Sequence, residues 1–170
     1  MKILNIFKKK EKINNFKDIY LDKLADGDFI KIRLFNREKL VTIVSTGKNR
    51  FDEKGNYKKD HFELSNEEVE CLKWFVENVD ISNYTKEIIE YCNEQYSYYS
   101  DIKITEKDIE NEINITTITI RLGMLERSKD RFIYPEISFY GDCKCDEEHG
   151  ICIGFRDKKL IGINSQDWSL

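Results

Sequence analysis

The sequence predicts an α+β fold in which antiparallel strands, an N-terminal meander and C-terminal hairpins, flank a central pair of α-helices. Apolar and charged residues alternate over residues 30–34, as in a half-buried strand. Apolar residues recur at helical spacing over 69–79 and again over 84–95. Short apolar segments separated by turn residues return after position 131. This order places the helices between two groups of strands.

The first group of strands is predicted to be a three-stranded meander between residues 19 and 45. Asp26 and Gly27 form a dipeptide typical of tight hairpin turns. A second, apolar strand over 40–44 follows a short polar break. The next segment, 46–61, is rich in charge and holds two glycines, so we expect an exposed connection.

The first helix is predicted to begin at Ser65, because Ser65 and Glu68 have the spacing of a capping box. The second helix begins at Asp80 or Ser82 and carries Cys92 on its apolar face. Four tyrosines lie in the second half of this helix or after it: Tyr91, Tyr96, Tyr98 and Tyr99. Because this helix is acidic and phosphate contacts supply most nucleic-acid affinity, we expect core-edge residues and no nucleic-acid partner.

The C-terminal strands are predicted over 132–145, 151–156 and 160–164, preceded by one strand over 113–122. In that preceding strand the apolar positions change parity between Ile115 and Ile118, which predicts a β-bulge. Pro135 cannot donate a ladder hydrogen bond, so its strand begins there or lies at an edge.

Length and composition indicate a basic tail over 1–15 followed by one domain over 16–170, since 170 residues with 40% hydrophobic content suit a single core. The apolar run near the N-terminus is too short for a secretory signal, and no segment approaches the roughly 18 apolar residues of a membrane span. We therefore expect a cytoplasmic protein without an integral membrane segment, in which the five cysteines stay reduced.

The charge is distributed unevenly. Residues 1–60 hold 16 Lys and Arg against 9 Asp and Glu, whereas residues 61–170 hold 12 against 23. An acidic surface of this kind attracts a basic protein partner.

The stretch GDCKCDEEHGICIG, residues 141–154, concentrates the residues that carry chemistry. Cys143, Cys145, His149 and Cys152 have the number and type of ligands for tetrahedral zinc. Strand alternation, however, directs Cys143 and Cys145 toward the core and Cys152 away from it. We therefore expect no metal and no cofactor, with this ligand set as the alternative.

The loop between the two strands supports three interpretations. As a turn, Asp146 accepts amide hydrogen bonds and Gly150 supplies a positive φ. As a binding site, Asp146, Glu147, Glu148 and His149 contact a protein partner. As a catalytic site, Asp146, Glu148 and His149 supply acid/base groups, although the sequence contains no nucleophile motif beside them.

The segment from Glu136 to Trp168 resembles the C-terminal hairpins of a bacterial family of uncharacterised domains with the motif Cys-x-Trp-Asp-x-Glu-His-Gly. The positions that match are Cys143, Asp146, Glu148, His149 and Gly150, with a looser match at Gly162 and Asp167. Cys145 replaces the Trp of the motif. The resemblance extends weakly over 16–170, and some members are encoded near toxin systems, which implies an immunity or partner-binding role.

For function we expect a non-enzymatic, cytoplasmic protein-binding domain whose acidic surface neutralises a partner such as a cognate bacterial toxin domain. Occlusion of a partner requires shape and charge complementarity and no catalytic group. The alternative is a small enzyme or a ligand- or metal-binding protein centred on the Asp146–His149 hairpin.

Overall fold

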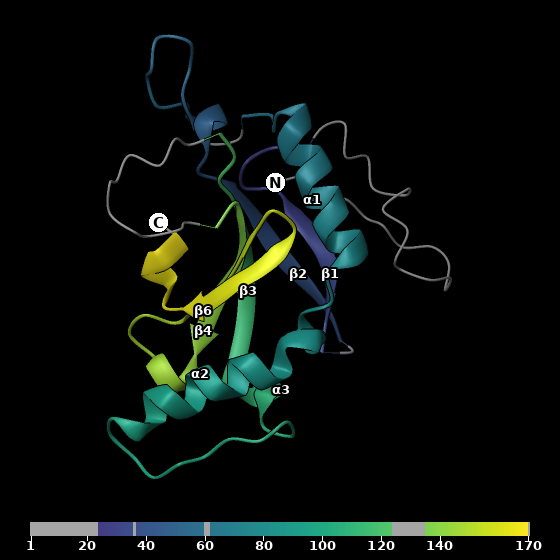
Figure 1. The fold of residues 1–170 in the computed structure, drawn as a ribbon. Helices are drawn as coiled ribbons and strands as arrows, with labels where there is room; N and C mark the ends of the chain where they lie inside the picture. The colour runs from purple at the N-terminus through teal and green to yellow at the C-terminus, as the bar shows by residue number, and fades with distance from the viewer. Residues whose placement is uncertain (1–23, 36, 60–61, 124–134, 170) are drawn as a thin grey trace.

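A computed structural model describes residues 24–35, 37–59, 62–123 and 135–169. Six strands form one sheet in which spatial order follows sequence order, β1 to β6 (Figure 1). The strands are β1 Phe29–Leu34, β2 Arg37–Ser45, β3 Ile113–Ile120, β4 Ile137–Cys143, β5 Ile151–Arg156 and β6 Lys159–Asn164. Neighbouring strands are antiparallel, except that β2 and β3 are parallel. The prediction of an α+β fold is confirmed, with this parallel pair as an addition.

The helices all lie between β2 and β3 in the chain. They are α1 Asn66–Asn78, α2 Thr85–Ser97 and the single turn α3 Ile109–Glu112. Two short 3-10 turns lie in the same segment, η3 Lys48–Arg50 and η4 Ile81–Tyr84. Two more lie later in the chain: η5 Lys144–Asp146 follows β4, and η6 Gln166–Ser169 follows β6. Because parallel neighbours cannot be joined by a tight turn, the helical segment is the crossover that returns the chain to the sheet.

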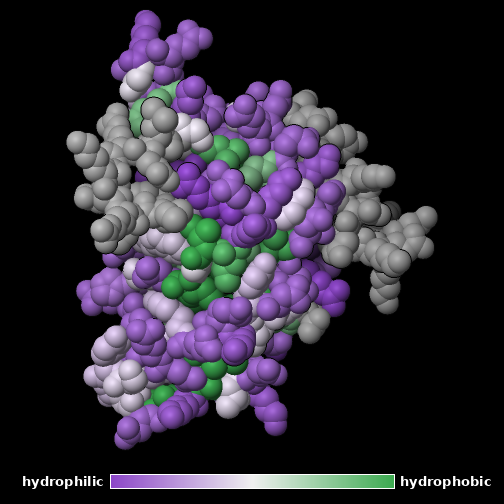
Figure 2. Space-filling view, viewed as in Figure 1, coloured by the Kyte–Doolittle hydropathy of each residue, from purple (hydrophilic) through white to green (hydrophobic). Residues whose placement is uncertain are grey.

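α1 and α2 cover one face of the sheet. Phe75 of α1 and Tyr84 of η4 each contact the ring of Phe155 on β5 edge-on, with centroids 5.2 and 5.4 Å apart. Ile88 and Cys92 of α2 are fully buried against the same core. On the side shown in Figure 2, hydrophobic residues gather around β6 between the two helices, and hydrophilic residues surround them.

The bulge predicted in β3 is confirmed. Its register with β4 shifts between Ile115 and Thr117. Ile113 and Ile115 before the shift, and Ile118 and Ile120 after it, are all buried. The extra residue therefore keeps four isoleucines on the helix-covered face, and it also aligns Ile113 with Cys143 at the end of β4.

The capping box is also confirmed, and its Glu68 serves a second purpose. The Ser65 hydroxyl accepts the Glu68 amide at 3.3 Å, and the Glu68 carboxylate accepts the Ser65 amide at 2.8 Å. Glu68 is buried, and its carboxylate also accepts from the Ser45 hydroxyl at 2.6 Å and the Asn49 amide at 2.8 Å. The start of α1 is thereby joined to the end of β2.

The prediction that 46–61 is an exposed connection is wrong at Arg50. This side chain is buried and forms an ion pair with the buried Asp26. A buried charge requires a partner, and Asp26 lies 24 positions earlier, so local composition does not reveal the pair. Of the predicted meander, β1 and β2 are present, whereas its proposed start at 19–23 and the basic tail at 1–15 lie outside the described residues.

The opposite face of the sheet is partly covered by the C-terminal turn η6. Gly154 of β5 and Gly162 of β6 are paired in the ladder, and the indole of Trp168 lies against both. Pro135 precedes β4, in agreement with a strand that begins after it. None of the helices in the described part of the chain is both long and apolar enough to span a bilayer.

Candidate functional site

The turn between β4 and β5 has the hydrogen bonds that the turn interpretation predicts. The Gly150 amide donates to the Asp146 carbonyl at 2.7 Å, and the His149 amide donates to the Asp146 carboxylate at 3.1 Å. The same carboxylate oxygen lies 3.0 Å from Nδ1 of His149. Gly150 has a φ of 59°, in the region that favours glycine. Asp146 and Gly150 therefore define the turn.

The turn is also held by α2 and η6. The hydroxyl of Tyr99, just after α2, donates to the Cys145 carbonyl, and that of Tyr91 lies 3.4 Å from the Gly150 carbonyl. The Gln166 backbone amide donates to the His149 carbonyl at 2.9 Å. Three residues from two other segments thus fix the backbone of this short loop.

The side chains of the turn point toward solvent. Glu147, Glu148 and His149 are exposed, and Asp146 is half-buried. The hydrogen bond that the His149 ring donates to the Asp146 carboxylate raises the pKa of His149, and the charges of Asp146, Glu148 and Asp167 act in the same direction. The structure therefore brings all four predicted binding residues together on one turn.

Tyr99 extends this exposed region beyond the turn through its contact with Cys145, and Tyr98 adjoins it in the chain. Tyr96 is buried, as expected for the core edge, but Tyr98 and Tyr99 have 72% and 63% of their surface exposed. The prediction of a core-edge role is wrong for these two because they follow the last residue of α2, where the helical spacing no longer applies. We call the combined region the turn surface: Tyr98, Tyr99, Asp146, Glu147, Glu148 and His149.

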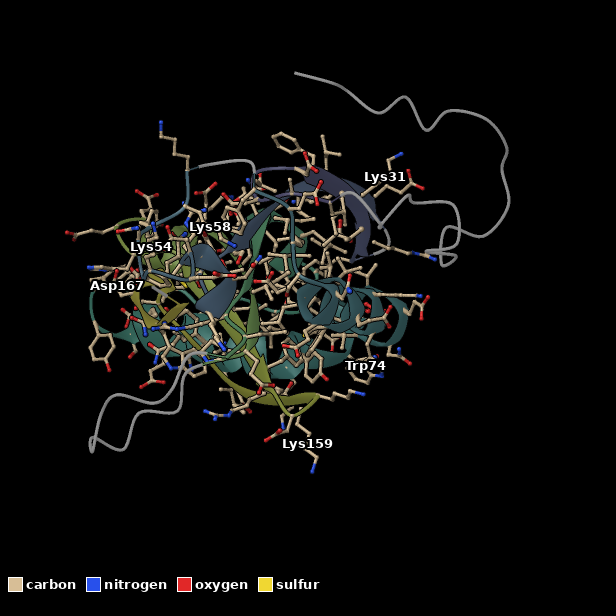
Figure 3. The ribbon with its side chains drawn as sticks, turned by 90° about the horizontal axis from the view of Figure 1, so that it is seen from above. Lys31, Lys54, Lys58, Trp74, Lys159 and Asp167 are labelled. Atoms are coloured by element: carbon tan, nitrogen blue, oxygen red, sulfur yellow. The ribbon has the colours of Figure 1, made fainter. Side chains whose placement is uncertain are left out.

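The catalytic hypothesis requires a cleft at this turn. One groove among the described residues lies away from the turn. Its volume is about 530 Å³, and it lies between α1 and the β5–β6 turn. Its lining residues are Glu70, Cys71, Trp74, Phe75, Glu136, Asp157 and Lys158. Figure 3 shows Trp74 far from Asp167, which belongs to η6 beside the predicted site. None of Asp146, Glu148 and His149 lines this groove.

Three cysteines converge beneath the turn. Sγ of Cys143 lies 3.7 Å from Sγ of Cys92 and 2.8 Å from Sγ of Cys145. All three residues are buried. Hydrogen bonds from the Cys145 and Cys92 thiols, and then from backbone amides, lower the pKa of Cys143 although burial opposes this shift. Cys143 is therefore the thiol most easily ionised within the cluster.

The four ligands of the predicted zinc alternative do not converge. Cys152 is buried, but its neighbours Ile151 and Ile153 face the helices, so Cys152 faces the other side of the sheet. His149 is exposed and paired with Asp146. The thiol that lies beside Cys143 and Cys145 is that of Cys92, which is not part of the predicted ligand set. The helical spacing predicts Cys92 on an apolar helix face, but only the packing of α2 against the end of β4 and η5 brings it to the other two thiols.

The described part of the chain forms a small α+β domain in which one fixed loop carries the exposed Glu147, Glu148 and His149. A family model described as "Domain of unknown function (DUF6985)" matches residues 15–170. The chain belongs to this family. No curated protein matches the chain, and no solved structure matches it.

Proposed function

We propose that this chain is a non-enzymatic protein-binding domain that contacts a basic partner through the turn surface. The observation that supports this proposal is the position of the exposed Tyr99 against the acidic turn, with the exposed Tyr98 next to it in the chain. As the specific form of this function we propose an immunity protein, which neutralises a bacterial toxin domain in the cytoplasm. The resemblance of the hairpin motif to domains encoded near toxin systems supports that form.

The composition of the turn surface suits a protein interface. Tyrosine rings bury a large apolar area at a small entropic cost and keep a hydroxyl for hydrogen bonding, so they are enriched where proteins bind. Carboxylates around such rings attract a basic partner and increase its association rate.

The fixed backbone of the turn adds to this argument. The loop is held by Tyr91, Tyr99 and Gln166 before any partner arrives. Because little conformational freedom remains to be lost on binding, more of the contact energy is available as affinity. The groove described above lies at the other end of β5 from the turn, so it does not add support to the alternative of an enzyme centred on Asp146, Glu148 and His149.

The proposal is tested by measuring the binding of the full chain to the products of neighbouring genes by calorimetry. With a binding partner, Tyr98→Ala and the double variant Glu147→Lys/Glu148→Lys should each weaken affinity at least tenfold, because hot-spot side chains and charge reversal cost about 1.4 kcal/mol or more. The loss of affinity caused by the charge variant should become smaller at high salt, because salt screens the charges.

Matched controls lie on other exposed surfaces. Leu40→Ala removes an apolar side chain with 64% of its surface exposed, and Glu77→Lys reverses an exposed charge on α1. Both controls should bind as the unmodified chain does. The proposal is rejected if no neighbouring product binds, or if the turn-surface variants bind as tightly as the controls.

A further inference from the structure

We propose that Cys92, Cys143 and Cys145 form a buried site for a soft monovalent metal ion, Cu(I), bound by three thiolates. The three Sγ atoms lie within 4.8 Å of one another and come from two parts of the chain, α2 and the end of β4 with η5. This inference is independent of the partner-binding function proposed above.

The spacing of the sulfur atoms suits three ligands around one metal ion, once the separation of Cys143 and Cys145 widens. With metal–sulfur distances of about 2.3 Å, thiolates around one ion lie about 3.8–4.0 Å apart. The 3.7 Å between Cys92 and Cys143 meets this requirement directly. The 2.8 Å between Cys143 and Cys145 must widen by about 1 Å when the ion binds, which requires one of these two side chains to rotate.

The chemistry of the ligands selects the ion. Thiolates are soft ligands that prefer Cu(I) and zinc to oxygen-binding ions such as magnesium and calcium. Zinc in structural sites takes four protein ligands, but the group within the described residues consists of three thiols. All three are buried, so solvent does not readily supply a fourth ligand. Cu(I) is satisfied by three sulfur ligands, which makes it the better match.

The surrounding fold holds the ligands in place. Cys143 pairs with Ile113 in the sheet, and the Cys145 carbonyl accepts from Tyr99. Cys92 lies on the buried face of α2 with Ile88 and Tyr96. A metal ion at this position would connect α2 to the turn and stabilise the folded chain in proportion to its affinity.

The test is an anaerobic titration of the reduced full-length chain with Cu(I) in the presence of a chromophoric competing chelator. We expect one ion per chain, with release of thiol protons and the appearance of sulfur-to-metal charge-transfer absorption. Serine variants at Cys92, Cys143 and Cys145 should each weaken binding at least tenfold. Cys152→Ser and Cys71→Ser change thiols outside the cluster and should leave affinity unchanged.

X-ray absorption spectroscopy of the unmodified chain with bound Cu(I) covers the case in which a serine variant does not fold. Three sulfur neighbours around copper are expected, and fewer than three would overturn the proposal. The proposal also fails if binding is substoichiometric, if Cys152→Ser weakens binding as much as the cluster variants do, or if equimolar Zn²⁺ displaces Cu(I).

Discussion

At the scale of single residues, two glycines in neighbouring strands make room for an indole ring. A Cβ atom at Gly154 would lie 2.7 Å from the ring of Trp168 and 3.0 Å from Cβ of Pro135, whereas one at Gly162 would lie 3.3 Å from the same ring. The ring and the proline are both rigid, so neither can move aside easily. A side chain at Gly154 would therefore clash more severely than one at Gly162.

We expect Gly154→Ala to lower the free energy of unfolding by about 1–3 kcal/mol, because overpacking forces the ring or the strand to move. Gly162→Ala is the matched control and should cost less, since its new methyl group meets the ring at 3.3 Å. Urea denaturation of both variants measures the difference. An equal or larger loss for Gly162→Ala would contradict this account of the packing.

His149 provides a second prediction at this scale. Its hydrogen bond with Asp146 raises its pKa above the ordinary value of 6.5. The interaction therefore stabilises the folded state fully below about pH 6.5 and is lost as the pH rises through the folded-state pKa. An NMR titration of the imidazole should show the raised pKa, and Asp146→Asn should return it toward 6.5. Glu147→Gln should change it less, and an unaltered pKa in Asp146→Asn would refute the assignment.

At the scale of elements, the start of α1 depends on Glu68 more than on Ser65, the N-cap residue. Ser65→Ala should lower the free energy of unfolding by about 1 kcal/mol through loss of the cap. Glu68→Ala should cost more than about 3 kcal/mol, because the Ser45 hydroxyl and the Asn49 amide also lose their acceptor. Thermal unfolding compares the two, with the exposed Glu67→Ala as a near-neutral control. A smaller loss of stability for Glu68→Ala than for Ser65→Ala would show that the hydrogen bonds from Ser45 and Asn49 do not stabilise the fold.

Several elements could be predicted because their signals are local. The capping box needs only Ser65 and Glu68 at the right spacing, and the bulge needs only the parity change between Ile115 and Ile118. The turn needs Asp146 and Gly150. In each case the residues that determine the backbone lie within a few positions of one another, so alternation and spacing are sufficient.

At the scale of the whole molecule, the sheet is most protected at its centre. β3 and β4 have a strand on each side, and their inward residues are covered by α1 and α2. In hydrogen exchange we expect the amides of β3 and β4 to be the slowest, and those of 52–57 to be among the fastest, because that segment is exposed. Slower exchange in β1 than in β3 would indicate a different cooperative core.

Long-range relationships at this scale could not be predicted. The parallel pairing of β2 with β3 depends on how the helical crossover returns to the sheet. The Asp26–Arg50 pair and the approach of Cys92 to Cys143 join positions that are 24 and 51 residues apart. Periodicity predicts which face of an element is buried, but it does not say which other element covers that face.

The placement of the two tryptophans gives the molecule two separate optical reporters. Trp74 lies in the groove beside Lys158 on the helix-covered side, and Trp168 lies against the glycines on the other face of the sheet. With Trp74 replaced by Phe, the remaining intrinsic fluorescence reports on docking of the C-terminal turn. With Trp168 replaced by Phe, it reports on occupation of the groove. The side of the sheet on which a ligand or partner acts can therefore be distinguished by emission alone.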